Sequence, residues 1–273
     1  MRRAAATPPP RVPGTDHGPR SIPLTLLVVA VFAVAARLQA VLVLVPAYRD
    51  LYDRHRFFVP ETLKSLLEIA LVALAVVLVH RLRLGAAARE LGFRRPVAWP
   101  LVMALLATLP MAVVFFFTAG VRPELPAAEI AYLALLSPLA EEVVFRGFAF
   151  RQLHRRAGWG FWPSVLVTAL VFGLVHVEGG RSMAQIAGIF LVTAVGGALF
   201  AWLFTVWGDS LAAPFALHAA MNLCWQLFAV GESALAGWLP TALQATTALS
   251  AIGITLLLRR RLAVAGTGEE LGR

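Results

Sequence analysis

The chain has 273 residues, of which 59% are hydrophobic and only 14% are charged. A soluble core of this length cannot bury so many apolar side chains, so the composition excludes a soluble globular protein and indicates a polytopic membrane protein. The net charge of +9 does not indicate nucleic-acid binding, because the arginines cluster at the ends of apolar segments, where they orient membrane helices.

The first 20 residues are rich in proline and arginine and show no apolar periodicity, so we expect a disordered cytoplasmic tail at 1–20. Beyond this tail we expect an all-α fold. A membrane helix needs about 20 apolar residues. On that basis we predict eight spans, near 22–46, 65–82, 98–119, 127–153, 161–178, 184–207, 211–230 and 236–258.

The connections between these spans alternate in charge. Arginines fall in the tail, between the second and third spans, between the fourth and fifth, and after the last. The positive-inside rule therefore predicts a multi-pass protein of the cell membrane with both termini cytoplasmic. The segment after the first span breaks the pattern, because its basic residues would lie outside, and an interfacial amphipathic helix carrying Phe57 and Phe58 would explain it.

Three regions follow the tail. We expect residues 21–120 to form an accessory transmembrane region, 121–235 to form the membrane core that carries the buried acidic residues and histidines, and 236–273 to form the last transmembrane helix with a cytoplasmic tail. Buried charges in the accessory region, Arg37 and Glu68, are predicted to pair across the first two spans.

Two adjacent acidic residues lie inside the apolar segment from Leu133 to Phe150. A charge at mid-bilayer costs about 2.5 to 3.5 kcal/mol on insertion scales, so the two carboxylates need a compensating role, either catalysis or structural pairing. Glu142 and Arg146 are one helical turn apart and can form an ion pair, whereas Glu141 is rotated by about 100 degrees. We therefore predict that Arg146 neutralises Glu142 and that Glu141 is free to act on a water as general base.

Two later spans carry histidines. Phe172 and His176 share one helical stripe, as do His218 and Asn222, because the members of each pair are four residues apart. Glu141 and His176 lie roughly 20 to 22 Å from the cytoplasmic ends of their helices, so adjacent helices can bring them to one level. His218 and Asn222 lie closer to the start of their helix, and a tilted helix or an earlier helix start would bring them to the same level. Phe172 is expected to shape the pocket wall.

These motifs, in this order, resemble the CAAX-protease and bacteriocin-processing (CPBP) family of intramembrane proteases, also called the type II CAAX prenyl endopeptidase or Abi family. The family pattern is Glu-Glu-x-x-x-Arg, then Phe-x-x-x-His, then His-x-x-x-Asn, each on a separate membrane helix. It corresponds here to Glu141, Glu142, Arg146, Phe172, His176, His218 and Asn222. The resemblance covers about residues 130 to 230.

The resemblance implies a helical bundle around a polar intramembrane cavity, and proteolysis at or within the membrane. It implies that Glu141 and His176 activate water while His218 and Asn222 stabilise the oxyanion, which suits the chemistry of these side chains. A second version is a metalloprotease, in which Glu141, His176 and His218 bind Zn²⁺ and Glu142 is the base. The familiar His-Glu-x-x-His zinc helix is absent, and the choice between no cofactor and zinc stays open.

We therefore expect an intramembrane endopeptidase that acts on a membrane-associated peptide or protein within the lipid bilayer. The alternative is a non-proteolytic membrane immunity or scaffolding protein that keeps the same fold to bind a partner peptide. A transporter with a carboxylate proton relay is a third hypothesis, but the combination of histidines and asparagine favours hydrolysis.

Overall fold

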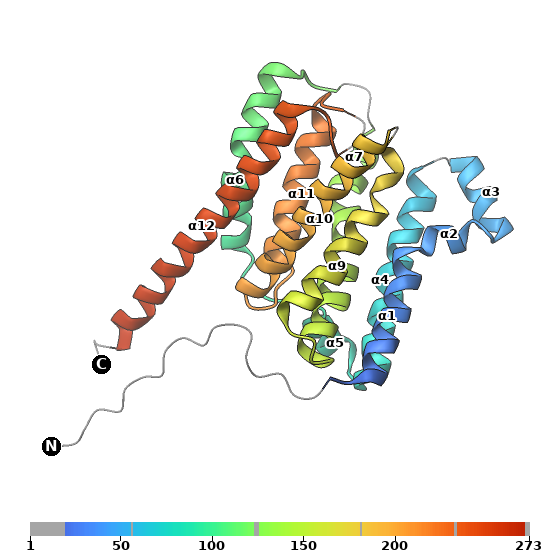
Figure 1. Ribbon diagram of the computed structural model, residues 1–273, viewed down its shortest axis with the longest axis horizontal. Helices are drawn as coiled ribbons and strands as arrows, with labels where there is room; N and C mark the ends of the chain where they lie inside the picture. Colours follow the sequence, from blue (N-terminus) through green and yellow to red (C-terminus); the bar gives the residue numbers. More distant parts are fainter. Residues whose placement is uncertain (1–19, 56, 123–125, 181, 232–233, 271–273) are drawn as a thin grey trace.

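The computed structural model describes residues 20–55, 57–122, 126–180, 182–231 and 234–270, which form the bundle of helices in Figure 1. Within those ranges, strand-like pairing is limited to an isolated antiparallel bridge between Val121 and Phe228. The expected all-α fold is therefore confirmed. The predicted disordered tail lies outside the described residues, apart from Arg20.

Four of the described helices are long and apolar enough to cross a membrane. They are α4 (Phe58–His80), α6 (Ala98–Thr118), α10 (Met183–Val206) and the Trp238–Leu258 part of α12 (Trp238–Glu270). The apolar helices α1 (Ile22–Ala36) and α9 (Phe161–Val175) have only 15 residues each, or about 22 Å, less than the roughly 30 Å hydrocarbon core. A membrane protein is confirmed, whereas eight full spans are not.

The first predicted span, 22–46, is interrupted. α1 ends at Ala36, because Arg37 leaves the helical conformation (φ −120°, ψ 18°) and a short helix α2 (Leu38–Leu42) follows. An exposed guanidinium avoids the cost of burial among apolar side chains, and the Arg37 side chain is 59% exposed. A separate polar helix, α3 (Pro46–His55), then precedes α4, which begins at Phe58 and not at 65 as predicted.

The predicted pair between Arg37 and Glu68 is wrong. Arg37 Nη1 instead lies 3.5 Å from Glu178 Oε1, on the short 3₁₀ helix η4 (Val177–Gly179). Both partners are exposed, so the pair joins the end of α1 to the end of α9 at the surface and contributes little free energy.

The fourth predicted span is a nearly continuous helix that changes its winding. Its parts are α7 (Ala127–Ala131), η1 (Tyr132–Leu136), α8 (Ser137–Glu142), η2 (Val143–Phe150) and η3 (Gln152–Arg156). The segments η1, η2 and η3 have the wide π winding, which occurs frequently at functional sites. Every residue of η2 is buried, so this helix is the centre of the bundle. At Gly147 a Cβ atom would clash with the carbonyl oxygen of Leu91, which explains the glycine.

Around this centre, α10 packs along α9, and α11 (Ala212–Leu227) packs along α6 (Figure 1). Aromatic rings fill the contact between η2 and α9, where Phe145 and Phe172 meet edge to face at 4.9 Å between ring centroids. Edge-to-face contact is a favoured arrangement of aromatic rings. This packing positions the three motifs relative to one another. Arg146 lies on η2, Phe172 on α9, and His218 on α11.

The arginine-rich connections meet at one end of the bundle, beside α5 (Leu84–Glu90). Arg156 Nε donates to the Glu90 carboxylate at 2.8 Å, and Arg155 Nε donates to the Asp209 carboxylate at 3.1 Å. Ion pairs thus join connections more than 50 residues apart in sequence at the same end of the bundle. The alternation of basic connections along the chain predicts this arrangement. Which side is cytoplasmic stays a prediction.

Candidate active site

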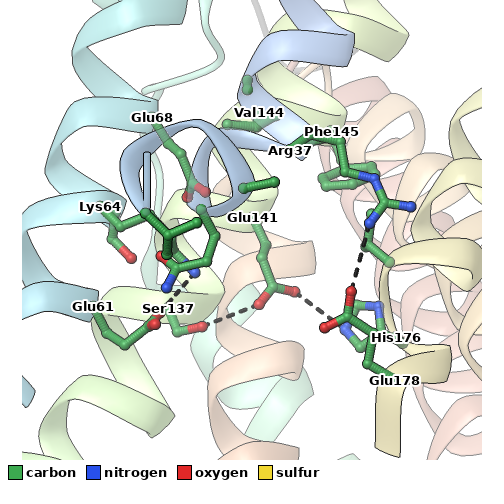
Figure 2. Close-up of a pocket in the computed structure, with 17 residues that line it drawn as sticks. Arg37, Glu61, Lys64, Glu68, Ser137, Glu141, Val144, Phe145, His176 and Glu178 are labelled. Carbon is green, nitrogen blue, oxygen red and sulfur yellow. Dashed lines mark hydrogen bonds and ion pairs between the residues drawn. The ribbon is translucent and has the colours of Figure 1, made fainter. Parts of the chain in front are cut away.

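A cavity of about 490 Å³ lies between α1, α2, α4, α8 and the end of α9 (Figure 2). Its polar wall includes Glu141 and His176, the first predicted catalytic pair. The remaining charged or polar lining residues are Arg37, Gln39, Glu61, Lys64, Ser65, Glu68, Ser137 and Glu178, and the larger apolar ones are Val43, Val144, Phe145 and Val175. A polar cavity within a largely apolar bundle is what the resemblance implied.

Glu142 and Arg146 form the predicted ion pair behind this cavity. Arg146 Nη1 lies 3.0 Å from Glu142 Oε1, and the two side chains are 2% and 0% exposed. Arg146 Nη2 also donates to the carbonyl oxygen of Gly197 at 3.3 Å. The rings of Phe172 and Phe200 lie 4.4 and 5.1 Å from the guanidinium carbon, which provides cation–π stabilisation of a desolvated charge.

Glu141 has a different environment. Its Oε1 accepts a hydrogen bond from Ser137 Oγ at 3.0 Å, one helical turn earlier. Its Oε2 is buried and has no hydrogen-bond partner in the described part of the chain. The Nε2 atoms of His176 and His218 are 3.7 and 3.9 Å away from it. These distances are too long for direct hydrogen bonds and suit a bridging water.

The two histidines are oriented by hydrogen bonds to their other ring nitrogens. His176 Nδ1–H donates to the carbonyl oxygen of Phe172 at 2.6 Å. This leaves the Nε2 lone pair of His176 facing Glu141. His218 Nδ1–H donates to Glu142 Oε1 at 2.8 Å. Phe200 stacks on the His218 ring at 5.0 Å between centroids. Both Nε2 atoms therefore face the same oxygen of Glu141.

Asn222 lies one helical turn beyond His218 on α11. Its Nδ2 donates to the carbonyl oxygen of Leu133 at 3.1 Å, in the π-wound segment η1. An amide nitrogen carries two hydrogens, so one N–H remains for a ligand. Phe172, predicted to shape the pocket wall, is buried behind His176 with 4.4 Å between the ring centroids, and Phe145 provides the aromatic wall of the cavity.

Sequence reasoning missed Ser137, Phe200 and the acidic residues that α4 contributes to the cavity. Ser137 is four residues before Glu141, so helical spacing could have indicated their contact. Phe200 lies on another helix, and no pattern in the sequence signals its stacking on His218.

Among the described residues, no group of three or more His, Cys, Asp or Glu side chains is arranged to hold a metal ion. Glu141, His176 and His218, the predicted zinc ligands, nevertheless converge, with the two Nε2 atoms 3.7 and 3.9 Å from Glu141 Oε2. The choice between a metal-free site and a zinc site therefore stays open.

Residues 123–224 match a protein-family model described as type II CAAX prenyl endopeptidase Rce1-like. No curated protein and no solved structure matches the chain. The matched segment contains all three motifs, from Glu141 to Asn222, and confirms the family resemblance drawn from them. Helices α1, α2 and α4, which supply the wall of the cavity facing Glu141, lie outside the match.

Proposed function

We propose that this protein is an intramembrane endopeptidase that hydrolyses a peptide bond of a membrane-associated peptide or protein, a proposal that the match of residues 123–224 to the CAAX prenyl endopeptidase model supports. The observation that carries the proposal is the unpartnered Glu141 Oε2, which faces the Nε2 atoms of His176 and His218 at 3.7 and 3.9 Å. A carboxylate oxygen in this position can hold and activate a water molecule.

In the first step, the water donates one hydrogen to Glu141 and the other to His176 Nε2. The tautomer of His176 suits this role, because its Nδ1–H is bound to Phe172. Ser137 fixes the orientation of the Glu141 carboxylate. As the water oxygen attacks the carbonyl carbon of the substrate, Glu141 takes its proton and the peptide C=O becomes an oxyanion.

In the second step, the oxyanion is stabilised by His218 and Asn222. Protonated His218 donates Nδ1–H to Glu142 and Nε2–H to the oxyanion, while Asn222 uses the amide hydrogen that Leu133 does not accept. The C–N bond then breaks, and Glu141 returns its proton to the leaving amine.

Glu142 and Arg146 support the reaction without touching the substrate. Glu142 balances the charge of protonated His218 and holds its ring through Nδ1, in the same way that a buried carboxylate orients a catalytic histidine. Arg146 in turn pairs with the Glu142 carboxylate in the core.

The test uses the purified full chain in detergent with a library of fluorogenic and membrane-anchored peptides. We expect Glu141→Gln to reduce kcat by about 10²- to 10⁴-fold, the usual contribution of a general base. Glu129→Gln, on α7 outside the cavity, is the matched control and should retain activity.

Each reaction is repeated with a zinc chelator. Cleavage that the chelator leaves unchanged supports the water mechanism. Cleavage that is lost with the chelator and returns when zinc is added supports the metalloprotease version. Equal cleavage by wild type and Glu141→Gln contradicts the proposal. A wild type that cleaves no peptide but binds a partner favours the immunity or scaffolding alternative.

A further inference from the structure

Glu68 of α4 lies in the catalytic cavity but has no role in the mechanism. It lines the same cavity of about 490 Å³ as Glu141. Figure 2 shows its carboxylate pointing into the cavity from the side opposite His176. Since α4 lies outside the segment that matches the protease family, Glu68 is a feature of this chain's accessory region.

The charges around the cavity are not balanced. Its lining includes four carboxylates, Glu61, Glu68, Glu141 and Glu178, and two permanent cations, Arg37 and Lys64. Both cations are engaged with other carboxylates, because Lys64 Nζ lies 2.8 Å from Glu61 Oε2 and Arg37 Nη1 lies 3.5 Å from Glu178 Oε1.

The carboxylate of Glu61 holds Lys64 firmly. Tyr52 Oη donates to Glu61 Oε1 at 3.2 Å, and Tyr132 Oη donates to its Oε2 at 3.4 Å. Lys64 and Glu68 are also one turn apart on α4. Lys64 is therefore near two carboxylates, those of Glu61 and Glu68, but is paired directly only with Glu61. No hydrogen bond or ion pair joins Glu68 to another described residue. Glu68 is therefore the carboxylate of the cavity that shares Lys64 only at longer range, with no ion pair of its own and no water-activating role.

A partly buried carboxylate among membrane helices is unfavourable unless a cation or hydrogen-bond donors compensate it. We infer that Glu68 is a specificity-determining residue that binds the cationic end of a lysine or arginine side chain of the substrate, next to the peptide bond held at Glu141. This inference rests on the proposed endopeptidase function and assigns its substrate class, a peptide with a basic residue near the cleaved bond.

The apolar wall of the cavity suits the rest of such a side chain. Val144, Phe145 and Val175 line the cavity together with Glu68. Lysine and arginine have aliphatic stems that pack on apolar surface while the charged end reaches a polar partner. An acidic substrate side chain would meet the carboxylates of Glu68 and Glu141 and would be repelled.

The experiment compares peptides that differ at one position, Lys, Gln or Glu, with the cleaved bond identified by mass spectrometry. We expect wild type to cleave the lysine peptide with about tenfold higher kcat/KM than the glutamine peptide. Glu68→Gln should abolish this preference while it retains cleavage of the glutamine peptide. Glu68→Lys should reverse it in favour of the glutamate peptide. Glu129→Gln, which leaves the cavity unchanged, should keep the wild-type preference.

Peptide binding separates this inference from the proposed function. Affinities of the same three peptides are measured by fluorescence anisotropy for Glu141→Gln and for Glu141→Gln with Glu68→Gln. A lysine preference that disappears with Glu68→Gln supports the inference even if no variant cleaves, in which case the endopeptidase proposal fails alone. Cleavage without any preference, or a preference that survives Glu68→Gln in both assays, overturns the inference and leaves the endopeptidase proposal standing.

Discussion

The carboxylates of Glu141 and Glu142 belong to consecutive residues but have opposite surroundings. Glu142 Oε1 lies 3.0 Å from Arg146 and 2.8 Å from His218, and the side chain is 0% exposed. Glu141 lines the cavity and leaves Oε2 without a hydrogen-bond partner among the described residues. One helical step of about 100 degrees separates a carboxylate that is paired in the core from one that lines the cavity.

Removal of one partner of the Glu142–Arg146 pair should destabilise the protein more than removal of both. Arg146→Met leaves Glu142 without its guanidinium and should cost about 3 to 5 kcal/mol. The double variant Glu142→Gln with Arg146→Met should recover most of the melting temperature, because the amide that replaces the buried carboxylate needs no cationic partner. It should remain poorly active, since His218 loses its carboxylate. Thermal unfolding and kcat measured together test this, and a double variant no more stable than Arg146→Met would contradict it.

Asn222 should act on the transition state. Loss of one oxyanion donor typically lowers kcat by about 10²- to 10³-fold, so we expect Asn222→Ala to lower kcat with little change in KM. The variant also loses a hydrogen bond to Leu133, worth about 1 kcal/mol. Measuring the melting temperature separates the two effects. A variant that is less stable but fully active would assign Asn222 a purely structural role.

Gly147 should not tolerate a side chain. A Cβ atom there would clash with the backbone of Leu91, and overpacking in a close-packed interior costs about 1 to 3 kcal/mol. Gly147→Ala should therefore lower the melting temperature. Gly196→Ala is the matched control, because a Cβ at this position in α10 meets nothing within 4 Å and alanine favours the helix by roughly 0.5 to 1 kcal/mol. Equal melting temperatures for the two variants would contradict the prediction.

Stability should fall in acid because of Glu90, which lies outside the spans. Burial raises its pKa, but the guanidinium groups of Arg156 and Arg151 outweigh burial and lower the pKa from 4.5 to about 2. A carboxyl whose folded pKa is depressed stabilises the folded state above its unfolded pKa, and this contribution disappears as pH falls through the folded pKa. We expect Glu90 to contribute a few kcal/mol near neutral pH, lost progressively between about pH 5 and 2.

The comparison of wild type with Glu90→Gln checks this contribution. Their melting temperatures should differ most at neutral pH and converge toward pH 2. A difference that is constant over this range would show that ionisation of Glu90 is not the cause.

Much of the site follows from local geometry in the sequence. Spacing of four residues placed Glu142 beside Arg146, and equal depth on neighbouring helices placed Glu141 near His176 at 3.7 Å. The composition indicated a membrane protein, and the order of the motifs indicated the family whose model matches residues 123–224. These two contacts join residues that are close in sequence or at equal depth on neighbouring helices, so approximate helical geometry is enough to predict them.

Other features depend on how helices rotate and slide against each other, which no local pattern specifies. The bond between His218 and Glu142 joins α11 to α8, and the stacking of Phe200 on His218 joins α10 to α11. The predicted partner of Arg37 was wrong because α1 ends one residue earlier and frees the side chain to reach Glu178. Local patterns in the sequence thus specify which polar side chains lie within the apolar segments and in what order, whereas tertiary packing decides which of them share one cavity.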